Sequence, residues 1–409
     1  MQRDEVKAFG ELAGAAAAGI AGHVREVHEG ISQRVFKLVP GAGMVRTIHD
    51  GVSSGAHSAS RALTGAIVNS GAGALGSRLP EGGPIDRSLA GRLAVGALNG
   101  MFGDALHRDG SVLTLNMSLR RGGADVAIDG PSLAAAFPDA TPRLAVFLHG
   151  LCETDDAWKL GAARHTPYGA RLQLEHGYTP LYIRYNSGLH VSENGRALAQ
   201  LMHDLVSSWP VGIGEIALIG HSMGGLVGRS ACYYDADAAW TDRVRHAFML
   251  GTPHRGAPLE RAANRLGSVL ARLPETRGFA TPLKVRSAGI KDLFHGYLTD
   301  EDWFGSDPDV YLRNAAREIP FLPSANHYFV CATLSREADA PLGRMVGDLL
   351  VLRASAWGQG RGERLRFPVD HYRHVGGANH FDLLNHPAIY EQIQGWLARE
   401  RELLSAASA

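Results

Sequence analysis

One serine of this chain lies in a sequence context that can turn a weak hydroxyl into a nucleophile. Ser222 stands in Gly220-His-Ser-Met-Gly-Gly225, after the apolar run 215–219 and before a helix-like run, 226–234. A serine at a sharp turn from a buried strand into a helix is typical of a nucleophile elbow. We expect glycines two residues before and after this serine because side chains there would collide across the turn. The context predicts acyl transfer through Ser222.

The bare pattern G-x-S-x-G is weak on its own. It occurs a second time, at Gly51-Val-Ser53-Ser-Gly55, and random placement of 50 glycines and the serines in 409 residues gives on the order of 0.4 such matches. The segment around Ser53 has helical spacing and no strand before it, so we interpret it as a chance match. The assignment of Ser222 therefore depends on its partners.

A serine nucleophile needs an adjacent base, and the base needs an orienting acid. In hydrolases built around such an elbow, the chain order is serine, acid, histidine. Asp348 follows the strand candidate that ends at Cys331 and is flanked by apolar residues, where an unpaired carboxylate would be unfavourable. Asp339 lies in a polar part of the same connection and is interpreted as solvated surface. We predict that Asp348 is the acid.

His380 is the predicted base. It stands in the glycine-rich stretch Gly376-Gly-Ala-Asn-His-Phe381, directly after the last strand candidate, which places it at the carboxyl edge of the sheet where loops converge. His374 is the fallback. Structural roles are favoured for the remaining histidines beyond residue 326, which are His327, His371 and His386.

Two backbone amides are expected to hold the developing oxyanion. The amide of Met223 opens the helix after the elbow. The second amide should come from the turn His149-Gly150-Leu151 after the first long apolar run. We predict the amide of Leu151, with Cys152 as the next choice. Cys152 as an alternative nucleophile would leave the elbow unexplained.

The elements that must position these groups alternate between strands and helices. Ser111–Leu119 and Asp125–Asp129 read as a hairpin around Arg-Arg-Gly-Gly. The unbroken apolar run at 143–148 predicts a strand buried on both faces, and later apolar-rich runs are interpreted as strands of the same type. Helical segments such as 194–208 lie between them. The prediction is an α/β fold whose mostly parallel sheet begins with an antiparallel hairpin. The predicted parallel strands are Arg143–Leu148, Pro180–Tyr185, Glu215–Ile219, Val244–Leu250, His327–Cys331 and His371–Val375.

Residues 1–110 form a predicted helical N-terminal region, and residues 111–409 form the predicted catalytic domain. The spacing of apolar residues predicts helices over 24–38, 45–66 and 84–107. These helices are interpreted as a cap on the catalytic domain, with a membrane-surface or dimerisation arm as the alternative. The histidines of this region have no metal-ligand spacing.

Residues 256–320 interrupt the alternation of strands and helices. An insertion of this length is usually functional or has helices of its own. We predict a lid over the site, with a structural excursion as the alternative. Its apolar residues suggest an acyl pocket, although they could simply pack the insertion; they are Leu266, Val269, Leu270, Phe279, Leu293, Phe294 and Trp303.

Composition narrows the class of partner. Lysine plus arginine and aspartate plus glutamate both number 41, so no nucleic-acid partner is indicated and any membrane contact is expected to be peripheral. No signal peptide or membrane span is recognised, so cytoplasmic residence is expected. Three scattered cysteines suggest neither disulfides nor zinc. We expect no cofactor and no metal.

Taken together, the motifs resemble the α/β-hydrolase serine esterases and lipases, particularly the bacterial triacylglycerol lipase branch and relatives similar to GPI inositol-deacylase. The resemblance covers residues 112–400, and residues 1–110 have no counterpart in the simple lipases. Asp348-Leu349 stands where such lipases often have Asp-Gly. The motifs that carry it are His149-Gly-Leu151, Gly220-His-Ser-Met-Gly-Gly225, Leu250-Gly-Thr-Pro-His-Arg-Gly256, Gly347-Asp-Leu-Leu-Val351 and Asn379-His380.

By this resemblance, Ser222, Asp348 and His380 form the triad, and Leu151 and Met223 supply the oxyanion amides. The expected function is a serine carboxylic-ester hydrolase that acts through an acyl-enzyme on a small-molecule or lipid ester with an apolar acyl group. An acyltransferase or thioesterase with the same triad is an alternative. A non-hydrolytic protein of this fold that binds a ligand or partner is another. A homodimer through the N-terminal helices is considered.

Overall fold

The computed structural model describes residues 88–256, 287–304, 316–337, 348, 350–358 and 367–408. Within them, residues 92–105, 114–256 and those from 287 onward form one compact unit, and the ends of helix α3 belong to another. The predicted helices 24–38 and 45–66, and Ser53, lie outside the described residues. The boundary after residue 110 stays a prediction.

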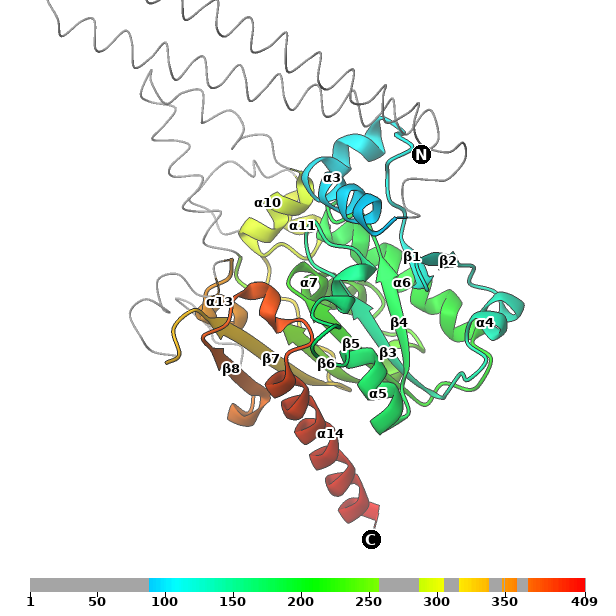
Figure 1. The fold of residues 1–409 in the computed structure, drawn as a ribbon, viewed down its shortest axis with the longest axis vertical. Coiled ribbons are helices and arrows are strands. Elements are labelled where there is room, and N and C mark those ends of the chain that lie inside the picture. The colour runs from blue at the N-terminus through cyan, green and yellow to red at the C-terminus, as the bar shows by residue number, and fades with distance from the viewer. Residues whose placement is uncertain are drawn as a thin grey trace, which may run out of the picture. The chain divides into compact units, whose positions relative to one another are not determined.

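An eight-stranded sheet has the order β2-β1-β4-β3-β5-β6-β7-β8, which Figure 1 shows running across the molecule. Strands β3 to β8 are parallel to one another, while β1 runs antiparallel to both β2 and β4. The strands are β1 (Ser118–Arg121), β2 (Ala124–Val126), β3 (Arg143–Leu148), β4 (Thr179–Arg184), β5 (Glu215–His221), β6 (Val244–Leu250), β7 (Asn326–Thr333) and β8 (Tyr372–Gly376).

Helices connect the strands and cover both faces of the sheet. They are α3 (Leu89–Arg108), α4 (Gly130–Ala136), α5 (Tyr168–His176), α6 (Val191–Ser208), α7 (Met223–Tyr234), α10 (Ala288–His295), α11 (Asp300–Trp303), α13 (Arg353–Ala356) and α14 (Pro387–Ser408). Short 3-10 turns are η2 (Asp155–Lys159), η3 (Thr241–Arg243), η4 (Val369–His371) and η5 (His380–Leu383).

Strand β3 shows why the central strands read as unbroken apolar runs. Leu144, Val146 and Leu148 pack into the cluster that contains α6 and α7. Ala145 and Phe147 point to the other face, into the cluster that contains α5 and α14. A parallel strand buried on both faces has no polar side to alternate with. The predicted fold class, an α/β-hydrolase fold with a mostly parallel sheet, is confirmed.

The N-terminal hairpin is present, but its first strand is shorter than predicted. The turn uses Gly122 and Gly123, both with positive φ, and β1 begins only at Ser118. The predicted strand over 111–119 is therefore wrong for most of its length. Part of the reason is that the amide of Leu115 donates to Oδ1 of Asn99 on α3 instead of a neighbouring strand.

The predicted third N-terminal helix corresponds to α3. The 256–320 insertion contains α10 and α11, and its segments 257–286 and 305–315 lie outside the described residues. In the described part of the chain, no helix is both long and apolar enough to cross a bilayer.

Candidate active site

Ser222 stands between the last residue of β5 and the first residue of α7. Its backbone has φ 52° and ψ −120°, a region that residues other than glycine rarely adopt. Its amide donates to the carbonyl of Leu250 at the end of β6, at 2.8 Å. Its side chain is 6 % exposed. Such strained backbone persists only where the surroundings hold it, and it clusters at functional sites.

The glycines of the motif are required by close backbone approach. A Cβ on Gly220 would lie 2.4 Å from the amide nitrogen of Gly225, so the predicted collision across the turn is confirmed. A Cβ on Gly224 would instead meet the carbonyl oxygen of Leu148, at 2.2 Å. Helix α7 therefore starts in direct contact with the end of β3, which leads into the predicted oxyanion turn.

The structure brings Asp348 and His380 together. Oδ2 of Asp348 lies 2.7 Å from Nδ1 of His380, and both side chains are almost completely buried. The other carboxylate oxygen, Oδ1, accepts from the amides of Leu350 and Val351 at 3.0 and 2.7 Å. The main chain of His380 is also held, because its amide donates to the carbonyl of Asp348 at 3.0 Å. The carboxylate thus has a fixed orientation toward the ring.

His380 and Ser222 flank the same short turn after β6. The turn contains Gly251, with φ 63°, directly after Leu250. A Cβ on Gly251 would lie 2.9 Å from Cε1 of His380. Nε2 of His380 is buried and has no hydrogen-bond partner among the described residues. A buried imidazole nitrogen that has no partner can accept a proton from a group that comes within hydrogen-bond reach.

The predicted oxyanion turn lies against Ser222. A Cβ on Gly150 would be 3.1 Å from the Cβ of Ser222. The amide of Gly150 donates to Glu153, and the amide of Cys152 donates to Oγ of Ser187 at 3.1 Å. The Leu151 amide, which lies between these two in the chain, donates no hydrogen bond to another described residue. The Met223 amide is in the first position of α7, where N–H groups have no intrahelical acceptor.

The alternatives weighed from the sequence have other surroundings. Nε2 of His374 lies 2.7 Å from Oγ1 of Thr333, and Nε2 of His327 lies 3.1 Å from the Leu322 carbonyl. Nδ1 of His371 lies 2.9 Å from the carbonyl of His327. Asp339 lies outside the described residues.

Cys152 adopts a positive φ of 63° in the oxyanion turn. Burial, followed by the charge of Glu153, raises the pKa of its thiol to about 11, so the thiolate that a nucleophile needs is disfavoured near neutral pH.

One pair beside the nucleophile was not predicted from the sequence. Oε2 of Glu153 accepts from the amide of Gly150 at 2.6 Å and lies 3.1 Å from Nδ1 of His221, the residue before the nucleophile. Nε2 of His221 lies 3.3 Å from the carbonyl oxygen of His380. The sequence signal was a glutamate four residues after His149 in the oxyanion turn, but only the fold pairs it with His221.

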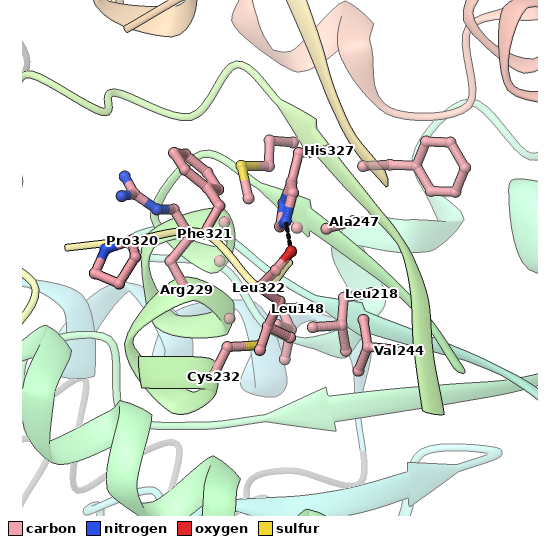
Figure 2. A pocket seen from close by; sticks show the side chains of 16 residues that line it. Leu148, Leu218, Arg229, Cys232, Val244, Ala247, Pro320, Phe321, Leu322 and His327 are labelled. Atoms are coloured by element: carbon pink, nitrogen blue, oxygen red, sulfur yellow. Dashed lines mark hydrogen bonds between the residues drawn. The ribbon is translucent and has the colours of Figure 1, made fainter. Parts of the chain in front are cut away.

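A small cavity lies beneath α7 and does not include the proposed triad. It is lined by residues of β3, β5, β6 and α7 and by Pro320, Phe321 and Leu322. Figure 2 shows Arg229 beside Phe321 on one side of it, and His327 bonded to the Leu322 carbonyl. Its volume of about 20 Å³ is room for about one water molecule.

Three of the predicted acyl-pocket residues are described. Leu293 packs against the core cluster, Phe294 is buried, and the ring of Trp303 stacks on His190 with centroids 3.8 Å apart. In the described structure they pack the insertion against the protein. The remaining four, Leu266, Val269, Leu270 and Phe279, lie outside the described residues, so the acyl pocket stays a prediction.

Comparisons with known proteins match this chain to one family model and to solved lipases and esterases. The family model described as "PGAP1-like alpha/beta domain" matches residues 185–313, which include the elbow. The lipase BlEst2 of Bacillus licheniformis is 18% identical, with a TM-score of 0.41, and the match covers 62% of this chain and 91% of that one. The esterase PF2001 of Pyrococcus furiosus is 12% identical, with a TM-score of 0.34, over 63% and 83% of the two chains.

The family match includes strands β5 and β6 of the sheet and the strand-to-helix turn at Ser222. The match ends before Asp348 and His380, so it does not bear on them. The resemblance drawn from the motifs is confirmed at the level of the fold: the chain is an α/β-hydrolase-fold protein with similarity to the PGAP1-like alpha/beta domain family.

Proposed function

We propose that this chain is a serine carboxylic-ester hydrolase in which Ser222 is the nucleophile, His380 the general base and Asp348 the orienting acid. The observation that supports this most is the buried bond of 2.7 Å between His380 Nδ1 and Asp348 Oδ2, together with an unpartnered His380 Nε2. A carboxylate on Nδ1 selects the tautomer whose Nε2 can accept the serine proton.

In the proposed reaction, Oγ of Ser222 attacks the ester carbonyl carbon while its proton moves to Nε2 of His380. The carbonyl π electrons move to the oxygen, and the tetrahedral intermediate collapses when His380 returns the proton to the leaving alcohol. Water then attacks the acyl-enzyme with His380 again as base, which releases the acid and restores the serine.

The oxyanion is proposed to be held by the amides of Leu151 and Met223. Removing one such donor typically reduces kcat by roughly 10²-fold to 10³-fold. The apolar acyl group is proposed to be bound by the 256–320 insertion, in keeping with the apolar residues predicted there. A profile of rates against acyl chain length, measured with esters of one alcohol, would identify the acyl group that is preferred.

The test compares Ser222→Ala with Ser53→Ala, the serine of the second G-x-S-x-G sequence. Hydrolysis of p-nitrophenyl esters and labelling by a fluorophosphonate probe are measured for both. We expect Ser222→Ala to lose at least about 10³-fold in kcat and all labelling, and Ser53→Ala to retain both. Equal hydrolysis by wild type and Ser222→Ala would overturn the proposal. A folded wild type that neither hydrolyses esters nor reacts with the probe would favour a binding protein.

A further inference from the structure

The pair formed by Glu153 and His221 connects three loops that the proposed reaction needs. Glu153 belongs to the oxyanion turn and holds its Gly150 amide at 2.6 Å. His221 is the last residue of β5 and directly precedes Ser222 in the chain. The Nε2 of His221 reaches the carbonyl of His380, at 3.3 Å.

The contacts of the two ring nitrogens indicate the charge of His221. Nδ1 faces a carboxylate oxygen of Glu153, and Nε2 faces a backbone carbonyl oxygen, and both of these groups only accept. A neutral imidazole has one N–H and can donate to only one of them. Both contacts are hydrogen bonds only when both ring nitrogens carry protons. With both protons the ring is an imidazolium, and the buried carboxylate of Glu153 is its counter-ion.

The environment of the pair favours the charged forms on both sides. Burial lowers the pKa of His221, but the charge and hydrogen bond of Glu153 outweigh it, so this pKa lies above the usual range. Burial raises the pKa of Glu153, and the charge and bond of His221 outweigh it in the opposite direction. The charge of Asp348 also favours His221 in its protonated form.

The groups around the ring of His221 restrict it further. The His380 ring lies with its centroid 4.7 Å away, and the rings of Trp158 and Phe381 are each at 6.4 Å. His221 is completely buried, and the side chain of Glu153 is 9 % exposed. Water has little access to replace either bond, so a lost partner leaves a buried polar group unsatisfied.

We propose that Glu153 and His221 are a positioning pair, in which a protonated His221 holds the oxyanion turn and the His380 loop in register with Ser222. This inference rests on the proposed function for its effect on turnover, but the protonation state of His221 can be tested without any activity. Neither residue touches the reacting atoms in this proposal.

The first experiment records long-range proton–nitrogen NMR spectra of full-length protein labelled with ¹⁵N-histidine, with the His221 signal assigned by its loss in His221→Gln. At about pH 8, where a free histidine is neutral, we expect both ring nitrogens of His221 to carry protons. His149 is the internal reference: its Nδ1 faces the Gly150 carbonyl, and its Nε2 accepts from the Tyr185 amide at 3.2 Å. That arrangement predicts a neutral ring, so a neutral His221 beside a neutral His149 would overturn the inference.

The second experiment measures kcat and KM for p-nitrophenyl acetate in Glu153→Gln, Glu153→Asp, His221→Gln and the double variant Glu153→Gln with His221→Gln. Loss of register is expected to reduce kcat by on the order of tenfold or more with KM little changed. Because the two residues act as one unit, the double variant should lose no more than the worse single variant. Glu153→Asp, which keeps the charge, should recover part of the rate and the doubly protonated signal.

The matched control is Glu215→Gln. It removes a carboxylate at the first residue of β5, the end opposite to His221, and this carboxylate lies 3.4 Å from the buried His246 of β6. It should lose stability without the selective loss of kcat. The positioning role is wrong if Glu153→Gln loses only stability, as the control does. It is also wrong if the fold-losses in kcat of Glu153→Gln and His221→Gln multiply in the double variant. If wild type shows no esterase activity but His221 is doubly protonated, the proposed function fails while the charge assignment stands.

Discussion

At the scale of single residues, the backbone conformation of Ser222 depends on two neighbouring glycines, Gly220 and Gly224, that have no side chain. Its positive φ is maintained because the glycines before and after it let β5 and α7 approach the neighbouring backbone. A single methyl group at either glycine would have to occupy space already filled by main-chain atoms. Main-chain atoms cannot move aside as the end of a flexible side chain can. A methyl group at either glycine would therefore force the backbone itself to shift.

Gly224→Ala and Gly228→Ala compare two positions on the same helix. A Cβ at Gly224 meets the Leu148 carbonyl at 2.2 Å, whereas one at Gly228 meets only the flexible Cδ1 of Leu148 at 3.1 Å. We expect Gly224→Ala to lower the free energy of unfolding by about 1–3 kcal/mol. Gly228→Ala should be neutral or gain up to about 1 kcal/mol from helix propensity. Urea unfolding measures both, and equal stability of the two variants would contradict this prediction.

Asp348→Asn tests the tautomer imposed on His380. The asparagine Oδ1 can still accept from the amides of Leu350 and Val351, so the fold should be retained. Its amide group then faces Nδ1 as a donor and stabilises the tautomer whose Nε2 already carries a proton. We expect kcat for p-nitrophenyl esters to fall by roughly 10³-fold to 10⁴-fold. An unchanged melting temperature with an unchanged kcat would show that Asp348 is not the acid.

At the scale of elements, helix α3 reaches the oxyanion turn through its glycines. A Cβ on Gly100 would lie 2.4 Å from the Sγ of Cys152, and one on Gly96 would lie 2.7 Å from the side chain of Thr154. The side-chain amide of Asn186 also donates a hydrogen bond to the carbonyl of Gly103, at 3.0 Å. The described residues 92–105 therefore support the loop that is proposed to stabilise the transition state.

Gly100→Leu is expected to displace the oxyanion turn. The larger side chain must push against the main chain of Cys152, whose nitrogen would be 2.7 Å from the first added carbon. We expect a loss of stability of about 1–3 kcal/mol and a fall in kcat that exceeds the fall in the folded fraction. Met101→Ala, at a half-exposed position of the same helix, is the control and should change kcat little. A Gly100→Leu enzyme with wild-type kcat would show that α3 does not support the turn.

At the scale of the whole molecule, a polar cluster at the amino end of β5 ties together strands from both halves of the sheet. Glu215 receives two hydrogen bonds from Arg143 of β3, at 3.0 and 3.1 Å, and one from Tyr178. His246 of β6 lies 3.4 Å away. Burial raises the pKa of Glu215, but the bonds from His246 and Tyr178 and the charge of Arg143 outweigh it and lower that pKa to about 2.

This carboxylate should contribute to acid stability. Since its pKa is lower in the folded chain than in the unfolded one, its contribution is present above the unfolded pKa of about 4.3 and is lost as the pH falls toward about 2. Glu215→Gln should therefore lower the free energy of unfolding by roughly 1–3 kcal/mol near neutral pH and flatten its decline across that window. Urea unfolding at several pH values tests this, with the exposed Glu391→Gln as control. A decline as steep as that of wild type would contradict it.

Much of the fold could be predicted from local patterns. Strands β3 and β6 begin and end at the predicted residues, because most of their side chains are buried and apolar. The edge strand β1 could not be predicted as well, since the backbone before it bonds to the Asn99 side chain on α3, a partner that local periodicity does not show. Helices α10 and α11 of the insertion could not be predicted individually for the same reason. The contacts that hold them, such as that of His190 with Asp292 on α10, join residues far apart in the chain.

The sequence by itself determined the strand-to-helix turn at Ser222 and the order in which an acid and a histidine follow it, because apolar runs and glycines are local signals. Only the tertiary structure decided that Asp348 and His380 meet at 2.7 Å, and that Glu153 pairs with His221. These pairs join residues far apart in the chain. Their formation depends on how the loops at the carboxyl edge of the sheet pack together, which spacing along one segment does not specify.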